Sequence, residues 1–238
     1  MSKRHTLFFV ALFHCVVAYA DSPIAAFKAE YVALRNNSEV ARTTIQLSEN
    51  ADSTWTLRTT TTGTSTLAKM AGLDVAEEST VRWVDGRPES LGYDFSQELA
   101  FKNRRRHGEF DWDTMQVHMV DGKSDVHYSL VPYTVDRHAL PLALASDLSR
   151  NSDSFEYKVA HKTAIEDVRY TECGEVSLTV PAGTFTTRCL ERVREKRTSK
   201  SWFDGANGWV PVQIEHTENK GDIITLKLVS IDRGGKGE

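Results

Sequence analysis

The ten residues Val176-Ser177-Leu178-Thr179-Val180-Pro181-Ala182-Gly183-Thr184-Phe185 already indicate the class of structure. Apolar and polar side chains alternate up to Val180, the turn formers Pro181 and Gly183 follow, and a second strand-like run begins at Phe185. Proline presets the entry of a turn and glycine accepts a positive φ, so we predict a β-hairpin that pairs Val180 with Phe185. Strands joined by so short a turn must be antiparallel.

The same period of two continues on both sides of this hairpin. In Thr54–Thr62 it places Trp55 and Leu57 on one face, and the threonines suit a pleated surface because they are β-branched. Asp121-Gly122 between two alternating runs is a strong hairpin signal. We expect roughly fourteen strands. A sheet of that size avoids exposed edges by curling, so the predicted fold is all-β, a curved antiparallel sheet of half-barrel or barrel-like form.

Two segments have helical character, Ser65–Gly72 and Leu140–Arg150. Gly72 is a natural helix end, and Pro141 is tolerated because it lies in the first turn of the second helix. Each apolar stripe either packs against the sheet or covers one mouth of the curved sheet and lines an apolar cavity. The candidate cavity-lining residues are Leu67, Met70, Leu140, Leu144 and Leu148.

The N-terminus has the pattern of a secretory signal. Lys3 and Arg4 precede an apolar run over Leu7–Val17, and Ala18-Tyr19-Ala20 forms a cleavage site. Because the run is too short to span a bilayer, residues 1–20 are predicted to be a signal peptide cleaved after Ala20, and an uncleaved anchor is the alternative. With no linker in the remainder, we expect residues 21–238 to form a single β-rich domain without a transmembrane segment, located in the periplasm.

The charge of the chain argues against nucleic acid as a partner. Removing residues 1–20 leaves 27 basic against 33 acidic residues, a net charge of −6. A nucleic-acid site needs a basic surface. The one basic cluster, Arg104–His107, is followed by Glu109, Asp111 and Asp113, so we interpret it as a self-neutralised, solvated strand end, with an anion or lipid-headgroup site as the alternative.

Cys173 and Cys189 are the cysteines that remain after cleavage, and an oxidising compartment favours a disulfide between them. The predicted hairpin pairs Val176 with Cys189, which leaves Cys173 three residues out of register. Three residues of strand span about 10 Å, beyond the Cα separation of about 7 Å that a disulfide tolerates. A bulge at Gly174 would close the gap. Both a disulfide and two buried thiols therefore remain open.

The region after the hairpin carries a family resemblance. Thr179–Phe185, Ser201-Trp202-Phe203 and Trp209–Glu215 are followed by the apolar run Leu226–Ser230. In this order they resemble the bacterial family catalogued as domain of unknown function 3108, over about residues 26–231. The resemblance implies an exported, mostly antiparallel β protein and brings no catalytic residues. A looser likeness, at the level of fold, is to the half-barrels of periplasmic lipoprotein carriers.

A proline and three aromatic residues near the C-terminus each allow a structural and a functional interpretation. Pro211 has no amide donor, so its strand is expected to be an edge or to carry a bulge, and an edge would suit a docking partner. Trp202, Phe203 and Trp209 flank a loop and either close the core or form a lipid-contact patch.

No catalytic, cofactor or metal site is predicted. The Gly-x-Ser-x-Gly, Ser-x-x-Lys, His-Glu-x-x-His, Cys-x-x-Cys and phosphate-loop patterns are all missing from the sequence. If Val120 pairs with Lys123, then His118 faces Asp125 and is offset from His127. Asp111 and Asp113 are read as exposed charges.

We therefore expect a non-catalytic protein that binds or carries a hydrophobic envelope component, a lipid or an acylated protein. The alternative is a structural or interaction module in envelope assembly, and the third hypothesis is an enzyme with an unfamiliar site. The sequence leaves the ligand and the oligomeric state open.

Overall fold

The computed structural model describes residues 22–100, 103–195, 197–218 and 221–233. The predicted signal peptide and its cleavage site lie outside these residues. The described chain forms one sheet of fifteen strands with two short helices. The strands are β1 (Phe27–Arg35), β2 (Ser38–Glu49), β3 (Trp55–Gly63), β4 (Asp74–Val84), β5 (Arg87–Glu98), β6 (Arg104–Asp111), β7 (Gln116–Asp121), β8 (Ser124–Ser129), β9 (Thr134–Asp136), β10 (Phe155–Ala160), β11 (Ile165–Val180), β12 (Gly183–Arg194), β13 (Arg197–Asp204), β14 (Val210–Thr217) and β15 (Ile223–Asp232).

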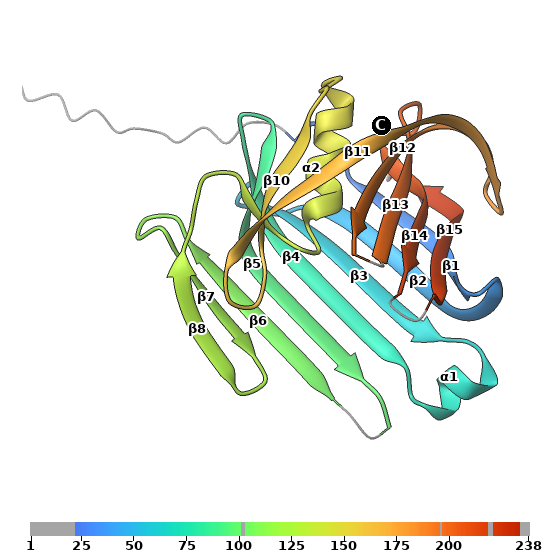
Figure 1. Cartoon of the computed structure of the whole chain (residues 1–238), viewed down its shortest axis with the longest axis horizontal. Coiled ribbons are helices and arrows are strands. Elements are labelled where there is room, and N and C mark those ends of the chain that lie inside the picture. Colours follow the sequence, from blue (N-terminus) through green and yellow to red (C-terminus); the bar gives the residue numbers. More distant parts are fainter. Residues whose placement is uncertain (1–21, 101–102, 196, 219–220, 234–238) are drawn as a thin grey trace, which may run out of the picture.

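The sheet is a long meander whose two halves join through β1 and β15. Its order is β8-β7-β6-β5-β4-β3-β2-β1-β15-β14-β13-β12-β11-β10-β9, so the open ends of the sheet are β8 and β9. Every pairing is antiparallel except that of β9 with β10. The strongly curved wall in Figure 1 confirms the predicted fold class.

Helix α2 (Leu140–Ser149) lies inside the curve of the sheet (Figure 1). It is the crossover between the parallel strands β9 and β10, a connection that a tight turn cannot make. The sequence predicts one buried apolar stripe along this helix, but eight of its ten residues are buried. The sheet curls round the helix, so nearly every face of the helix meets protein. No helix among the described residues is long and apolar enough to cross a membrane.

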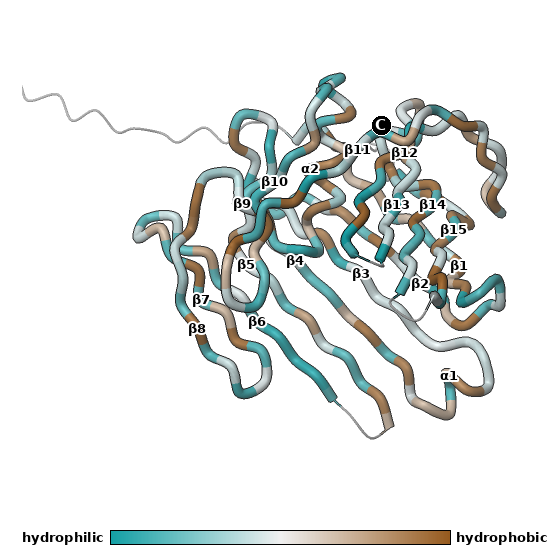
Figure 2. The backbone as a smooth tube through the Cα atoms, viewed as in Figure 1, coloured by the Kyte–Doolittle hydropathy of each residue, from teal (hydrophilic) through white to brown (hydrophobic). Residues whose placement is uncertain are grey.

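The inward faces of the strands build the core. Hydrophobic and hydrophilic residues alternate along β7, where Val117 and Met119 are buried (Figure 2). The larger core cluster surrounds α2 and includes Tyr31, Trp83 and Phe203. A smaller cluster lies beneath β5 to β8. The alternation read from the sequence therefore marks the inner face correctly.

The register of the β11–β12 hairpin differs from the prediction. Val180 pairs with Gly183 because the turn is only Pro181-Ala182, which shifts the partners of Gly174 to Val180 by two residues. A bulge between Glu172 and Gly174 then brings the two cysteines together, and a disulfide joins Cys173 to Cys189 with a Cα separation of 5.0 Å. Gly174 has a φ of +94°, a conformation that other residues rarely adopt. The bulge alternative is thus the one the structure contains.

The prediction for Pro211 is confirmed in its bulge alternative. Strand β14 pairs with both β13 and β15 and is no edge, but the register shifts between Trp202 and Phe203, and Pro211 lies opposite Phe203.

One further register prediction needs correction. The turn between β7 and β8 is Gly122-Lys123, because Asp121 itself pairs with Ser124 in the ladder. His118 therefore lies directly opposite His127 instead of Asp125.

Candidate functional site: a cleft on the concave face

An apolar pocket of about 240 Å³ lies between the N-terminal half of α2 and the concave face of the sheet. Apolar side chains from β1 to β3, β14 and β15 form its walls, and polar side chains stand on its lip. The apolar lining includes Phe27, Ile45, Leu57, Leu140, Leu144, Trp209 and Leu226, and the polar lip consists of Thr59, Glu77, Arg137, His138, Ser201 and His216.

The buried carboxylate of Asp136 places α2 against the sheet. Asp136 is 1% exposed and accepts hydrogen bonds from the hydroxyls of Ser79 on β4 and Ser90 on β5, at 2.8 and 2.7 Å. It also accepts the backbone amides of His138 and Ala139, at 2.8 and 3.0 Å, just ahead of the helix. One side chain thus ties the start of the helix to two strands and satisfies amides that lack a helical partner.

A β-bulge turns Ser90 towards this carboxylate. Thr80 pairs with Gly92 but Val81 pairs with Ser90, so Leu91 is an extra residue on β5. The extra residue breaks the alternation and puts Ser90 on the inner face. The hydroxyl therefore reaches Asp136 because of a local irregularity in the strand.

An ion pair forms the charged part of the lip, with the side chain of Glu77 18% exposed and that of Arg137 42% exposed. Arg137 pairs with Glu77 on β4, and Arg137 Nε donates to the hydroxyl of Tyr93 on β5 at 2.9 Å. Burial favours the neutral acid, but the charge of Arg137 outweighs it and holds the pKa of Glu77 below its ordinary value. Burial raises the pKa of the Tyr93 hydroxyl. The lip thus carries a fixed negative and a fixed positive charge at neutral pH.

His138 lies beside this pair with both ring nitrogens occupied. Its Nδ1 is 2.8 Å from Ser79 Oγ and its Nε2 is 2.8 Å from Thr59 Oγ1. Burial lowers the pKa of His138, so the ring is neutral at pH 7. A neutral imidazole next to a hydroxyl can accept its proton, which is the first requirement of nucleophilic catalysis.

A second, more open hollow of about 740 Å³ runs along β3 to β7, and most of its lining side chains, among them Arg58, Glu78, Asp94 and Arg105, alternate onto the face of the sheet opposite to the apolar pocket. On the inner face, at the end of β7, Asp121 forms ion pairs with Arg104, Arg106 and Lys162. Arg106 is 7% exposed and its guanidinium lies over the ring of Phe95. The predicted solvated arginine cluster is therefore corrected, because the pleat turns Arg106 inward while Arg105 stays exposed.

The structure separates the predicted cavity-lining residues into three groups. Leu140 and Leu144 line the apolar pocket. Leu148 is fully buried in the core and does not reach the pocket. Leu67 and Met70 are 80% and 77% exposed, so their assignment to a cavity is wrong. Their helix, α1 (Thr66–Met70), ends the β3–β4 connection far from α2, where neither face of the sheet can cover it (Figure 1).

The aromatic residues near the C-terminus mainly close the core. Phe203 is fully buried, Trp202 is half-buried, and Trp209 packs on the core and lines the pocket. Asp111 accepts the amides of Asp113 and Thr114 and so closes the turn after β6. These residues have structural partners.

The residues of the polar lip were hard to predict from the sequence. Glu77 and Arg137 are sixty positions apart, and Thr59 is one of several threonines on its strand. The one available signal was Asp136-Arg137-His138 directly before a helix whose second residue is proline, which is a typical helix start.

Residues 27–229 match the family described as "Protein of unknown function (DUF3108)". No curated protein matches the chain. Among solved structures, the β-barrel-like protein of family DUF1849 from Brucella abortus is similar, with a TM-score of 0.55 and 10% identity over 89% of this chain and 99% of that one. At this identity the likeness concerns the fold.

Two other solved structures are less similar. One is MucB, with a TM-score of 0.36 and 15% identity over 90% of this chain and 55% of that chain. The other is described as a putative lipoprotein from Parabacteroides distasonis, with a TM-score of 0.38 and 10% identity over 89% of this chain and 97% of that chain.

Proposed function

Because the chain belongs to the DUF3108 family, whose function is unknown, we propose a role from the geometry of the concave face. The protein is an exported, non-catalytic binder of an amphipathic component of the cell envelope, a lipid or an acylated protein. It holds one apolar chain between α2 and the sheet. The observation that carries the proposal is the apolar pocket of about 240 Å³ with a charged lip.

The size of the pocket limits the ligand. Pockets for drug-sized ligands measure about 300–1,000 Å³, so this one suits a single acyl chain or a large apolar side chain. Eight of the ten residues of α2 are buried inside the sheet, and the pocket of about 240 Å³ beside the helix is too small for several chains at once. The proposal is therefore a binder of one chain and not a shuttle with a large empty barrel.

The charges beside the pocket suit a polar headgroup. Arg137 and Glu77 line the apolar pocket, and the side chain of Arg137 is 42% exposed to solvent. A ligand that buries its apolar chain against Leu144 would place its headgroup beside this ion pair. The arrangement of an apolar wall with a few fixed polar groups is typical of small-molecule sites.

The test combines extraction with variants that fill the pocket. Mass spectrometry of organic extracts of the purified protein identifies any bound lipid, and titration with a fluorescent fatty acid measures affinity. Ile45→Trp and Leu226→Trp each fill the pocket from a half-buried wall position and are expected to weaken binding at least tenfold. Val176→Trp, on an exposed surface, is the matched control. The proposal would be overturned if extracts of the wild-type protein contain no lipid and the protein binds no fluorescent fatty acid, or if the pocket variants bind it as tightly as the control.

Two features support an exported location. The first is the signal-like sequence of residues 1–20, and the second is the disulfide, because disulfides persist mainly in oxidising compartments. Fractionation of the native host and mass measurement of the mature chain test this. We expect a periplasmic protein whose first residue is Asp21, and a cytoplasmic protein that retains Met1 would contradict it.

One contact favours a second candidate function, catalysis at the lip. Thr59 Oγ1 lies 2.8 Å from Nε2 of the neutral His138, and the pocket beside them would receive an acyl group. A panel of p-nitrophenyl acyl esters tests this. Catalysis at the lip requires that Thr59→Ala removes turnover while Thr61→Ala, on the same face of β3, preserves it. Equal rates in both variants would reject this candidate.

A further inference from the structure

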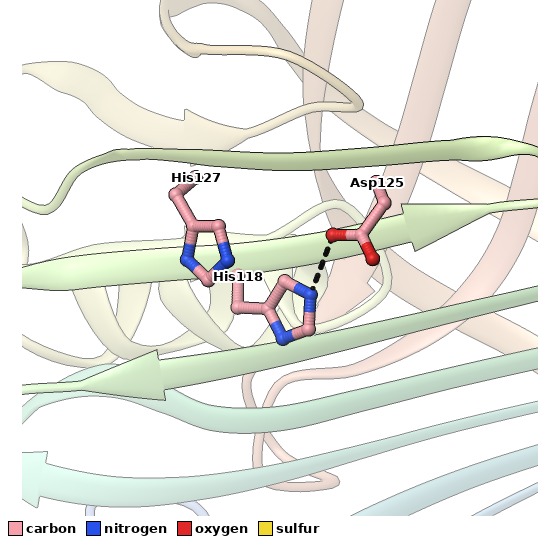
Figure 3. A group of neighbouring side chains, drawn as sticks. All are labelled: His118, Asp125 and His127. Carbon is pink, nitrogen blue, oxygen red and sulfur yellow. Dashed lines mark hydrogen bonds and ion pairs between the residues drawn. The ribbon is translucent and has the colours of Figure 1, made fainter.

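The hairpin of β7 and β8 carries two histidines in direct cross-strand contact on its exposed face. His118 pairs with His127, and their rings stack with centroids 4.3 Å apart and an angle of 5° between the planes. Asp125 lies two residues before His127 on the same face, and its Oδ1 is 2.8 Å from His118 Nε2 (Figure 3).

These three side chains can converge on one ion. One ligand atom from each of His118, Asp125 and His127 lies within 4.8 Å of the others. Ligands bound to one tetrahedral zinc ion at about 2.1 Å lie roughly 3.3 Å apart. We expect reorientation of the side chains to supply the remaining contraction, because the side chains of Asp125 and His118 are 66% and 31% exposed.

A second carboxylate stands behind the first histidine. Glu109 on β6 pairs with His118, and its Oε2 lies 3.6 Å from His118 Nδ1, on the side of the ring opposite to Asp125. When a histidine binds a metal through one nitrogen, its other nitrogen usually donates to a carboxylate that fixes the ring. Glu109 is placed for this role.

Further acidic and imidazole side chains lie next to Glu109 on the same face of the sheet. Its Oε1 lies 3.2 Å from His107 Nε2, and His107 Nδ1 lies 2.8 Å from Asp94 Oδ1 on β5. Acidic and imidazole groups thus alternate over four strands, and the carboxylates make this part of the surface attractive to cations.

We propose that His118, His127 and Asp125 form a binding site for a divalent transition metal, with Zn²⁺ as the ion of reference. Two imidazoles and one carboxylate are a ligand set that zinc accepts, and the exposed face leaves at least one coordination position for water or a further ligand. Glu109 is a positioning residue that orients the His118 ring. The site is separate from the pocket under α2 and does not depend on the function proposed for it.

The direct test is calorimetric titration of tag-free, EDTA-treated and dialysed protein with ZnCl₂. We expect one saturable site per chain. His118→Ala and His127→Ala should each weaken binding at least tenfold, and Glu109→Gln should weaken it about 10- to 100-fold as is typical of carboxylates behind a metal ligand. His161→Ala, at a half-buried histidine between β10 and β11 whose ring lies near Glu166, is the matched control and should bind like the wild type.

A second measurement separates loss of ligands from loss of fold. Circular dichroism and thermal unfolding of each variant without metal should match the wild type, because all three ligand positions are at least partly exposed. Zinc should also shift the ring NMR signals of His118 and His127 before those of other histidines. Absence of saturable binding by the wild type, or unchanged affinity in the double variant of His118 and His127, would overturn the proposal.

Discussion

Ser90 and Asp136 are joined by two hydrogen bonds of 2.7 Å, in which the Ser90 hydroxyl donates to Asp136 Oδ2 and accepts from the Asp136 backbone amide. The two residues are 46 positions apart and fully or almost fully buried. Their contact fixes the short strand β9 on the inner face of β5, and α2 starts directly after β9. The position of the helix, and with it the shape of the pocket, therefore depends on this pair.

Ser90→Ala is expected to lower the free energy of unfolding by about 1–3 kcal/mol, because it leaves a buried carboxylate oxygen and a buried amide without a partner. Urea unfolding monitored by circular dichroism measures the loss. Ser230→Ala is the control, since that serine is exposed and makes one long hydrogen bond to Glu30. Equal stability of the two variants would show that Asp136 does not depend on Ser90.

The disulfide supplies a second prediction. Cys173 and Cys189 enclose a sequence separation of 16 residues, for which loss of chain entropy in the unfolded state predicts about 3 kcal/mol of stabilisation. Reduction by dithiothreitol should lower the unfolding midpoint, and Cys173 is exposed to the reagent. The Cys173→Ser/Cys189→Ser variant should have the lower midpoint with or without reductant. A wild type that is insensitive to reductant would indicate that the bond contributes little.

Acid should destabilise the cluster of ion pairs around Asp121. Burial alone would raise the pKa of Asp121, but hydrogen bonds from Arg104 and Lys162 outweigh it and hold the pKa well below the usual value. A carboxyl group whose pKa is lower in the folded state stabilises the fold fully above its unfolded pKa of about 3.9, and this stability is lost as the pH falls towards the folded value. We therefore expect the free energy of unfolding to fall as the pH drops from about 5 to 2.

The Asp121→Asn variant isolates this contribution. Its stability should depend less on pH over the same range, and at pH 7 it should be less stable than the wild type because buried Arg106 loses its partner. Asp113→Asn, at an exposed position, should keep the wild-type slope. Chemical unfolding at a series of pH values measures both slopes, and parallel curves for Asp121→Asn and the wild type would contradict the assignment.

The strands and the fold class were predictable because alternation and turn residues are local signals. Registers were not, since a register depends on which residues form the turn. The turn Pro181-Ala182 is shorter than the sequence suggested, and the turn Gly122-Lys123 lies one residue further along the chain than the predicted Asp121-Gly122. Each shift moved the partners by two positions, which hid the His118–His127 pair.

The candidate site was harder to predict than the sheet. Leu140 and Leu144 were identified by their spacing, but Glu77 and Arg137 meet only because the sheet curls until β9 lies over β4 and β5. The same closure buries most faces of α2, although its sequence suggests one apolar stripe. Leu67 and Met70 have an equally apolar pattern and remain exposed, because no part of the sheet curls over α1. Helical periodicity indicates which side chains of a helix can be buried. It does not indicate whether a part of the sheet will lie over them.

Two leucines of α2 provide the sharpest test of the pocket. Leu144 and Leu148 are both buried, one turn apart, but only Leu144 lines the pocket. Truncation of either to alanine should cost about 2–5 kcal/mol of stability, because each removes similar buried apolar volume. Leu144→Ala should also enlarge the pocket and so change either the affinity for fluorescent fatty acids or the range of chain lengths that bind. Leu148→Ala should change neither, because it leaves the pocket walls intact. Unfolding and binding are measured on both variants at one temperature, well below either midpoint. If both variants change binding alike, the ligand responds to the stability of α2 and not to the pocket, and the proposed binding mode fails.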